Sequence, residues 1–164
     1  MTPTVPEVLH LYVSPGHNFF GRHGMPAGEH PMIEVDSVTC VAGRGLVGDR
    51  FFDYGPDYPG QVTFFAQEVF QALCDRLRVH DKGPGVLRRN IITRGIDLNA
   101  LVGHDFTVGA VRCRGRRLCE PCMVLQRYAS RPLLRPLVHR AGLRADILED
   151  GLIRIGDPVE AGPA

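Results

Sequence analysis

The segment that decides the fold of this chain is Val111-Arg112-Cys113-Arg114-Gly115-Arg116-Arg117-Leu118-Cys119-Glu120-Pro121-Cys122. Its alternating first half runs into two thiols, Cys119 and Cys122, with a proline between them. A thiol reacts or binds metal as its thiolate, and nearby cations lower its pKa from about 8.5. The arginines that precede Cys119 should therefore favour the thiolate. A buried structural cysteine pair and a zinc half-site remain alternatives, because a zinc ribbon needs a second pair of thiols.

The first half of this segment predicts the second arm of a β-hairpin. His104 to Val108 and Val111 to Gly115 flank the dipeptide Gly109-Ala110. On the second arm three arginines share one face, because strand side chains alternate. Three neighbouring cations need water, acidic partners or an anionic ligand. These residues are Arg112, Arg114 and Arg116.

Short strands also dominate the rest of the chain. Apolar alternation and turn residues predict strands at Val8–Val13, Ile33–Ala42 and Gln61–Ala66, a strand that starts the segment Arg88–Leu98 and closes in a turn, and a last hairpin of Ala145–Leu148 and Leu152–Ile155. Apolar residues at helical spacing, Cys74 among them, predict a helix over Gln67–Val79 as part of the core. Two further short helices are expected at Met123–Tyr128 and from Pro132 to Gly142. The pattern predicts an α+β fold, a small β-barrel with a few flanking helices, in one domain over residues 1–164.

Composition excludes several classes of protein. The chain has 164 residues, of which 44% are hydrophobic, and a net charge of +1. Near-neutral charge argues against nucleic-acid binding, and no apolar run is long enough to span a bilayer. Five cysteines without a disulfide framework, and a start without the pattern of a signal peptide, predict a cytoplasmic location. Of the 19 basic residues only Lys82 is a lysine, so planar guanidinium groups suited to phosphate or carboxylate are abundant.

A long loop rich in glycine and proline is expected between Pro15 and Pro31. It carries His17, His23 and His30, whose spacing matches no common metal site. Loops of this length in a compact domain are usually functional or disordered, and we expect this one to line a pocket.

The chain resembles the MOSC domain, the family named after the C-terminal domain of molybdenum cofactor sulfurase. The resemblance rests on an ordered set of short motifs spread over nearly all of the chain. They are Gly48-Asp49-Arg50, Arg88-Arg89-Asn90-Ile91, Gly95-Ile96-Asp97-Leu98, Gly103, Gly109, Cys119-Glu120-Pro121-Cys122, His139-Arg140-Ala141-Gly142 and Ile155-Gly156-Asp157-Pro158-Val159.

This resemblance implies a MOSC-type β-barrel and a molybdopterin-type ligand, with Cys122 as the molybdenum ligand or sulfur carrier and Cys119 in support. A soft thiolate suits the open positions of molybdenum held by a dithiolene. The phosphate of the pterin needs fixed donors, for which Arg88, Arg89 and Arg140 are the candidates, and Asn90 is expected to bond a pterin edge. Asp49 and Asp97 are expected either in the cofactor site or as braces for the arginines. Pyridoxal phosphate is not expected, since Lys82 alone could form its Schiff base.

Two functions from different classes follow from the resemblance. The first is a molybdenum-cofactor oxidoreductase that reduces small N-hydroxylated or related substrates, with a separate protein as electron donor. The second is a non-catalytic carrier of the cofactor or its sulfur. A zinc-bound structural module that uses Cys119 and Cys122 is a third, lesser alternative.

Overall fold

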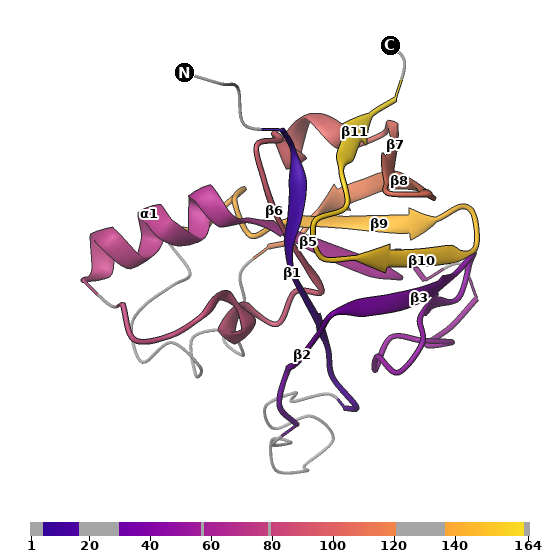
Figure 1. Ribbon diagram of the computed structural model, residues 1–164, viewed down its shortest axis with the longest axis horizontal. Coiled ribbons are helices and arrows are strands. Elements are labelled where there is room, and N and C mark those ends of the chain that lie inside the picture. The colour runs from indigo at the N-terminus through magenta and orange to yellow at the C-terminus, as the bar shows by residue number, and fades with distance from the viewer. Residues whose placement is uncertain (1–4, 17–29, 57, 79, 121–136, 163–164) are drawn as a thin grey trace.

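The computed structural model describes residues 5–16, 30–56, 58–78, 80–120 and 137–162 (Figure 1). Strands dominate, and α1 is the only α-helix within these ranges. The elements are β1 (Glu7–Val13), β2 (Ile33–Val35), β3 (Ser37–Val41), β4 (Gly45–Leu46), β5 (Val62–Ala66), α1 (Gln67–Leu77), η2 (Pro84–Leu87), β6 (Ile91–Arg94), η3 (Leu98–Leu101), β7 (Asp105–Val108), β8 (Val111–Leu118), β9 (Leu143–Ile147), β10 (Gly151–Arg154) and β11 (Val159–Ala161).

Eight of the strands form one curled sheet, and three form a smaller one. The large sheet has the order β11-β7-β8-β9-β5-β6-β1-β2, and the small one the order β10-β3-β4. The large sheet curls until its β11 end meets β1, the strand next to its other end: Val8 N donates to Asp157 O at 2.9 Å, and Val159 N donates to Pro6 O at 3.0 Å. This arrangement confirms the expected α+β fold with a barrel-like sheet.

Helix α1 extends from one side of the sheet (Figure 1). It connects β5 to β6, which pair in parallel, as a crossover helix does. The helix was expected to reach Val79 but ends at Leu77, because Arg78 adopts a left-handed conformation with a φ of 54°. That conformation ends the helical hydrogen-bond pattern.

Alternation along β5 and β6 produces two separate apolar cores. Phe64 and Ile91 point into the barrel, whereas Phe65 and Ile92 point outward against the apolar side of α1. Cys74 packs at the edge of this outer core, as the helical pattern predicted. Both faces of β5 and β6 are therefore covered, and the outer core also contains Cys119.

Two strand predictions were wrong, one in its continuity and one in its pairing. The strand expected over Ile33–Ala42 is divided at Asp36 into β2 and β3, which belong to different sheets. The expected last hairpin is absent, because β9 pairs with β5 and β8 while β10 pairs with β3. Instead of supporting a tight hairpin, Asp150 accepts a hydrogen bond from Ala42 N at 2.7 Å. The helix expected at Met123–Tyr128 lies outside the described residues. The helix expected from Pro132 to Gly142 is wrong in its second half, because the described residues 137–142 form a turn and not a helix.

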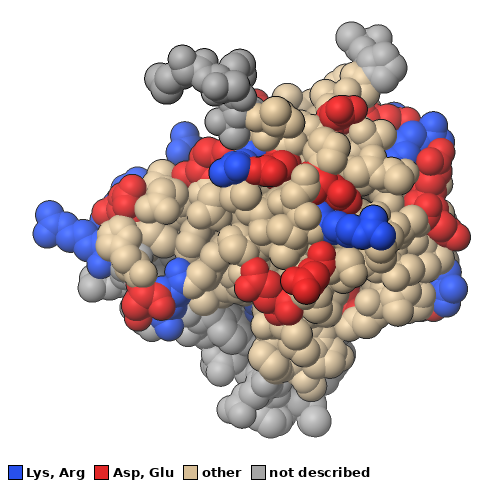
Figure 2. All heavy atoms as spheres, in the orientation of Figure 1, with Lys and Arg blue, Asp and Glu red and all other residues tan. Residues whose placement is uncertain are grey.

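The hairpin of β7 and β8 is confirmed, and so is the shared face of its three arginines. Each of them has an acidic partner: Arg112–Glu149 at 3.5 Å, Arg114–Asp105 at 3.0 Å and Arg116–Asp146 at 3.3 Å. Pairs as exposed as these contribute little to stability. Charges of both signs are likewise interspersed over the face shown in Figure 2. No helix in the described ranges is long and apolar enough to span a membrane.

Candidate functional site

Asp49 braces the turn that follows β4. Its carboxylate is buried and accepts hydrogen bonds from Ser14 N at 3.0 Å, from Arg50 Nη1 at 3.1 Å and from Phe51 N at 3.2 Å. Asp49 therefore connects the end of β1 to the turn and orients Arg50. The arginine that Asp49 contacts here is Arg50, and not one of the three that it was expected to brace.

Three guanidinium groups gather beside this carboxylate and form what we call the cationic cluster: Arg50, Arg88 and Arg89. Arg50 Nη2 donates to Arg88 O at 3.2 Å, and the Arg50 guanidinium lies 4.7 Å from the centroid of the Phe51 ring. Burial lowers the pKa of Arg50 to about 10; Asp49 opposes this shift, while the charges of Arg88 and Arg89 add to it. The cluster therefore concentrates positive charge in a place partly shielded from water.

Arg88 is almost fully buried, and its hydrogen bonds hold the chain on both sides of residues 17–29. It donates to His30 O at 2.7 Å, to Gly16 O at 3.0 Å and to Ser14 Oγ at 3.1 Å. The side chain thus fixes the two ends of the histidine-containing segment next to the cluster. His17 and His23 themselves lie outside the described residues.

Asn90 was expected to bond a pterin edge, and its amide is engaged within the fold. The residue is 1% exposed. Its Oδ1 accepts from both N and Oγ1 of Thr63 at 3.0 Å, and its Nδ2 donates to Tyr12 O at 3.1 Å. These bonds connect the end of β1 to the start of β5, directly after the cationic cluster in the sequence.

Arg89 and Cys119 meet at one short turn. Arg89 Nε donates to Ala141 O at 2.9 Å, and Cys119 N donates to Gly142 O at 2.7 Å. Arg89 is half-buried and Cys119 is 2% exposed in the outer core. The turn thus brings the cationic cluster to the thiol segment. Cys122 follows Cys119 by three positions and lies outside the described residues.

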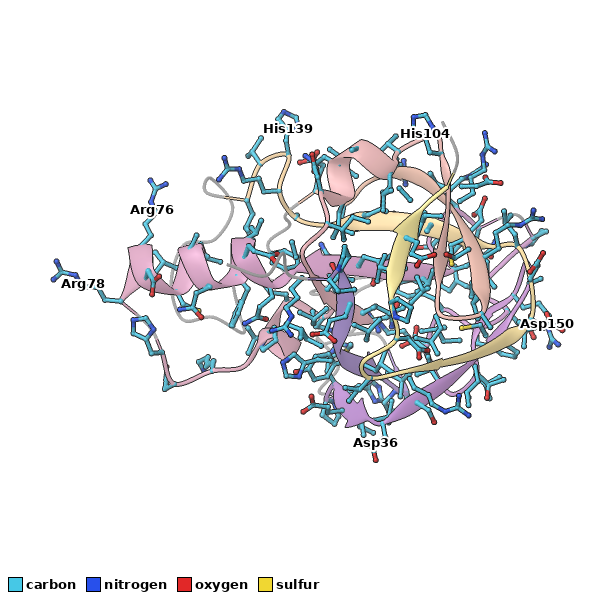
Figure 3. The ribbon with its side chains drawn as sticks, turned by 45° about the horizontal axis from the view of Figure 1, so that its top comes forward. Asp36, Arg76, Arg78, His104, His139 and Asp150 are labelled. Carbon is cyan, nitrogen blue, oxygen red and sulfur yellow. The ribbon has the colours of Figure 1, made fainter. Side chains whose placement is uncertain are left out.

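The same turn also contacts Glu120, the last described residue before Pro121. His139 Nδ1 lies 3.3 Å from Glu120 Oε1, and His139 O accepts from Asn99 Nδ2 at 3.0 Å. His139 is labelled in Figure 3, at the exposed side of the turn. The start of the Cys122 segment is therefore held both by strand pairing and by this contact.

Arg140 and Asp97 line a pocket of about 420 Å³ next to this turn. The pocket is formed by the start of α1, residues 95–99 and residues 140–142. Asp97 Oδ1 accepts from Asn99 N at 3.0 Å and begins η3. Among the predicted site residues that the structure describes, Arg140 and Asp97 stand apart from the cationic cluster, in the wall of this pocket.

The other described thiols are poor metal ligands. Burial raises the pKa of Cys40 to about 12 and that of Cys113 still further. The pKa of Cys74 is raised by burial and by Asp75 and Asp81. These thiols are protonated at neutral pH. Within the described ranges, no three His, Cys, Asp or Glu side chains lie close enough together to hold a metal ion.

Sequence reasoning did not select Arg50 or Ser14, although both belong to the network. The tripeptide Gly48-Asp49-Arg50 was part of the family resemblance, but only Asp49 was named as a site residue. An arginine directly after a buried aspartate, at a glycine turn, was the available signal for Arg50. Ser14 carried no signal, because its role depends on the distant residues Asp49 and Arg88.

Comparison with known proteins agrees with this fold. A search of curated proteins found no match. Solved structures with the same fold include YuaD from Bacillus subtilis, with 17% identity, coverage of 96% of both chains and a TM-score of 0.73. YiiM from Geobacillus stearothermophilus has 14% identity over 96% of this chain and 75% of its own, with a TM-score of 0.72. YiiM from Escherichia coli has 16% identity over 99% of this chain and 71% of its own, with a TM-score of 0.68.

The family model for the MOSC domain matches residues 50–160, which begin at Arg50 and include the cationic cluster, the thiol segment and the pocket. The match spans well over half of the 164 residues. The chain therefore belongs to the MOSC domain family.

Proposed function

We propose that this protein binds a molybdopterin-type molybdenum cofactor, with Cys122 as the ligand of the molybdenum. The MOSC family is associated with molybdenum cofactor binding. The observation that carries the proposal is the junction of Arg89 and Cys119 on the carbonyl groups of Ala141 and Gly142. This junction brings the cationic cluster and the segment leading to Cys122 to one turn, which supports a single site.

The chemistry of the cluster suits the phosphate of such a cofactor. The positive charges of Arg88 and Arg89 lower the pKa of Arg50, because like charges repel. The carboxylate of Asp49, which is hydrogen-bonded to Arg50, opposes this shift. A dianionic phosphate would relieve the mutual repulsion and accept charge-assisted hydrogen bonds. Arg50 and Arg89, both half-buried, would contact the phosphate. Arg88, Asp49 and Asn90 would hold these two side chains and the adjoining strands in place.

We further propose that the bound cofactor supports the reduction of small N-hydroxylated or related substrates. The molybdenum, when bound, supplies two-electron chemistry at an N–O bond. Two electrons from a separate donor protein and two protons convert an N–OH group to N–H and release the oxygen as water. The protein would bind the cofactor through Cys122 and the cluster, while the outer core around Cys119 keeps water from one side of the thiol segment.

A carrier of the cofactor or its sulfur is the second candidate function. The observation that favours it is the large exposure of the groups next to the thiol segment: His139 and Glu120 have side-chain exposures of 76% and 53%. A site open to this extent would allow transfer to another protein.

Turnover separates the two candidates. The protein is purified from cells that make the cofactor, and reduction of benzamidoxime is followed with reduced methyl viologen as electron donor. An oxidoreductase consumes the amidoxime catalytically, and the Cys122→Ser variant does not. Molybdenum-loaded protein without turnover would support the carrier and contradict the oxidoreductase.

A further inference from the structure

The pocket beside Arg140 lies where ligands commonly bind in folds with parallel strands. Strands β5 and β6 are parallel, and α1 connects them. Ala66 ends β5 and lines the pocket, and Gly95 directly follows β6. Crevices at the carboxyl ends of parallel strands are frequent ligand sites. A volume of about 420 Å³ is sufficient for a small organic molecule.

Hydrogen bonds join the segments that form the wall of this pocket. Glu68 Oε1 accepts from Gly95 N at 2.7 Å, and Asp97 Oδ1 accepts from Asn99 N at 3.0 Å. Asn99 Nδ2 donates to His139 O at 3.0 Å. The segment of residues 95–99 is thus connected by hydrogen bonds to α1, to the start of η3 and to the turn before β9. A ligand would enter a preformed site and would not have to order it.

The charged groups of the pocket are only partly used by the fold. Within the described residues, the guanidinium of Arg140 makes no hydrogen bond and no ion pair. For both Glu68 and Asp97, one carboxylate oxygen accepts a backbone N–H and the other has no hydrogen bond to the described part of the chain. Val69 and Ile96 add apolar surface to the same pocket. The lining therefore offers a cation, two anions and an apolar surface.

We propose that this pocket binds a small zwitterion, a molecule with a carboxylate, a protonated amine and a short apolar body. The carboxylate pairs with Arg140, the ammonium group pairs with the unused oxygens of Asp97 and Glu68, and the apolar body covers Val69 and Ile96. A purely anionic ligand would be repelled by two carboxylates, and a purely cationic one would leave Arg140 without a partner. This site is distinct from the proposed cofactor site, although Gly142 connects the two.

A matched series of probes tests this assignment on protein made in cells unable to synthesise molybdenum cofactor. The probes are leucine, 4-methylpentanoate, which lacks the amine, and 3-methylbutylamine, which lacks the carboxylate. Binding is followed by NMR titration. We expect leucine to bind about tenfold more tightly than either of the others, because each of them loses one charge-assisted contact. The proposal is overturned if no probe binds, or if leucine binds no more tightly than the acid and the amine.

Three variants locate the contacts. Arg140→Gln should weaken the binding of leucine and of 4-methylpentanoate but not that of 3-methylbutylamine. Asp97→Asn, which keeps a side chain able to cap η3, should weaken the binding of leucine and of the amine. Arg76→Gln is the control, since Arg76 points away from the body of the molecule on α1 (Figure 3). Equal affinities in Arg140→Gln and Arg76→Gln would contradict the site. Because these titrations contain no molybdenum, failure of the proposed cofactor function leaves their outcome unchanged.

Discussion

Arg89 and Cys119 are held by consecutive carbonyl groups of a single turn. The Nε of Arg89 donates to Ala141 O at 2.9 Å, and the backbone N of Cys119 donates to Gly142 O at 2.7 Å. A half-buried cation and a thiol segment 30 positions apart in the sequence are thereby fixed to the same two peptide groups. The turn positions both halves of the proposed cofactor site.

Replacing Arg89 by lysine should weaken cofactor binding by about tenfold or more. Lysine keeps the charge but loses the planar fork that allows paired contacts with phosphate, and 1.4 kcal/mol is about a factor of ten. The measurement is the Kd for molybdopterin-type cofactor added to cofactor-free protein. Arg78→Lys, at the end of α1 and exposed, is the control and should bind like the parent. Identical affinities in the two variants would place the phosphate elsewhere.

The turn that joins Arg89 to Cys119 depends on the glycine at position 142. A Cβ on Gly142, whose φ is +104°, would lie 2.0 Å from the backbone O of Phe64. Gly156 has a similar φ of +90°, but a Cβ added there would have no other atom within 4 Å. Gly156→Ala therefore measures the cost of the backbone conformation alone, about 1–3 kcal/mol. We expect Gly142→Ala to lose at least about 2 kcal/mol more in urea denaturation, or to fail to fold. Equal losses of unfolding free energy in Gly142→Ala and Gly156→Ala would contradict this prediction, because the turn would then be able to move away from β5 at no cost.

Asn90 should be required for stability, because its buried amide joins two strands. Asn90→Ala leaves the N and Oγ1 of Thr63 and the carbonyl of Tyr12 without these bonds. Each unsatisfied buried group costs about 1–3 kcal/mol, so the free energy of unfolding should fall by about 3 kcal/mol or more. Gln71→Ala, on the exposed side of α1, should change it by less than about 0.5 kcal/mol. A loss below 1 kcal/mol for Asn90→Ala would contradict this role.

Stability should fall at high pH through the buried thiol of Cys40. Burial raises its pKa from 9.0 to about 12, so the unfolded chain loses the proton first as the pH rises. The contribution of the protonated thiol to the free energy of unfolding is complete below pH 9. It is lost between pH 9 and about 12, at about 1.4 kcal/mol per pH unit. Denaturation of Cys40→Ala over the same range should show a correspondingly shallower decline than that of the parent. Parallel declines would show that Cys40 does not titrate in this way.

Local patterns predicted the elements whose neighbours in space are also neighbours in sequence. The β7–β8 hairpin and the crossover helix α1 belong to this group, since turn residues and apolar spacing are read within a few residues. The last hairpin was wrong because Asp150-Gly151 is a strong local turn signal, yet β10 pairs with β3, more than 100 residues earlier. Pairing between distant strands depends on tertiary packing, which no short pattern encodes.

The site shows the same division between local and distant information. Residue type and motif order were sufficient to name Arg89, Arg140 and Cys119 as candidates, but not to place them at one turn. They could not show that Arg88 is engaged with Gly16 and His30, or that Asn90 is engaged with Thr63. The sequence alone does not show whether an arginine binds backbone carbonyls or a phosphate. Its partner depends on the backbone that surrounds it in the folded chain.

Retention of molybdenum through Cys122 is tested most directly by measuring molybdenum and released-pterin fluorescence per protein in four samples purified alike. These are the parent, Cys122→Ser, Cys119→Ser and Cys74→Ser. We predict that Cys122→Ser loses molybdenum, that Cys74→Ser retains it, and that Cys119→Ser falls between them. Molybdenum-free parent protein from cofactor-producing cells, or equal retention in Cys122→Ser and Cys74→Ser, would contradict the proposed function.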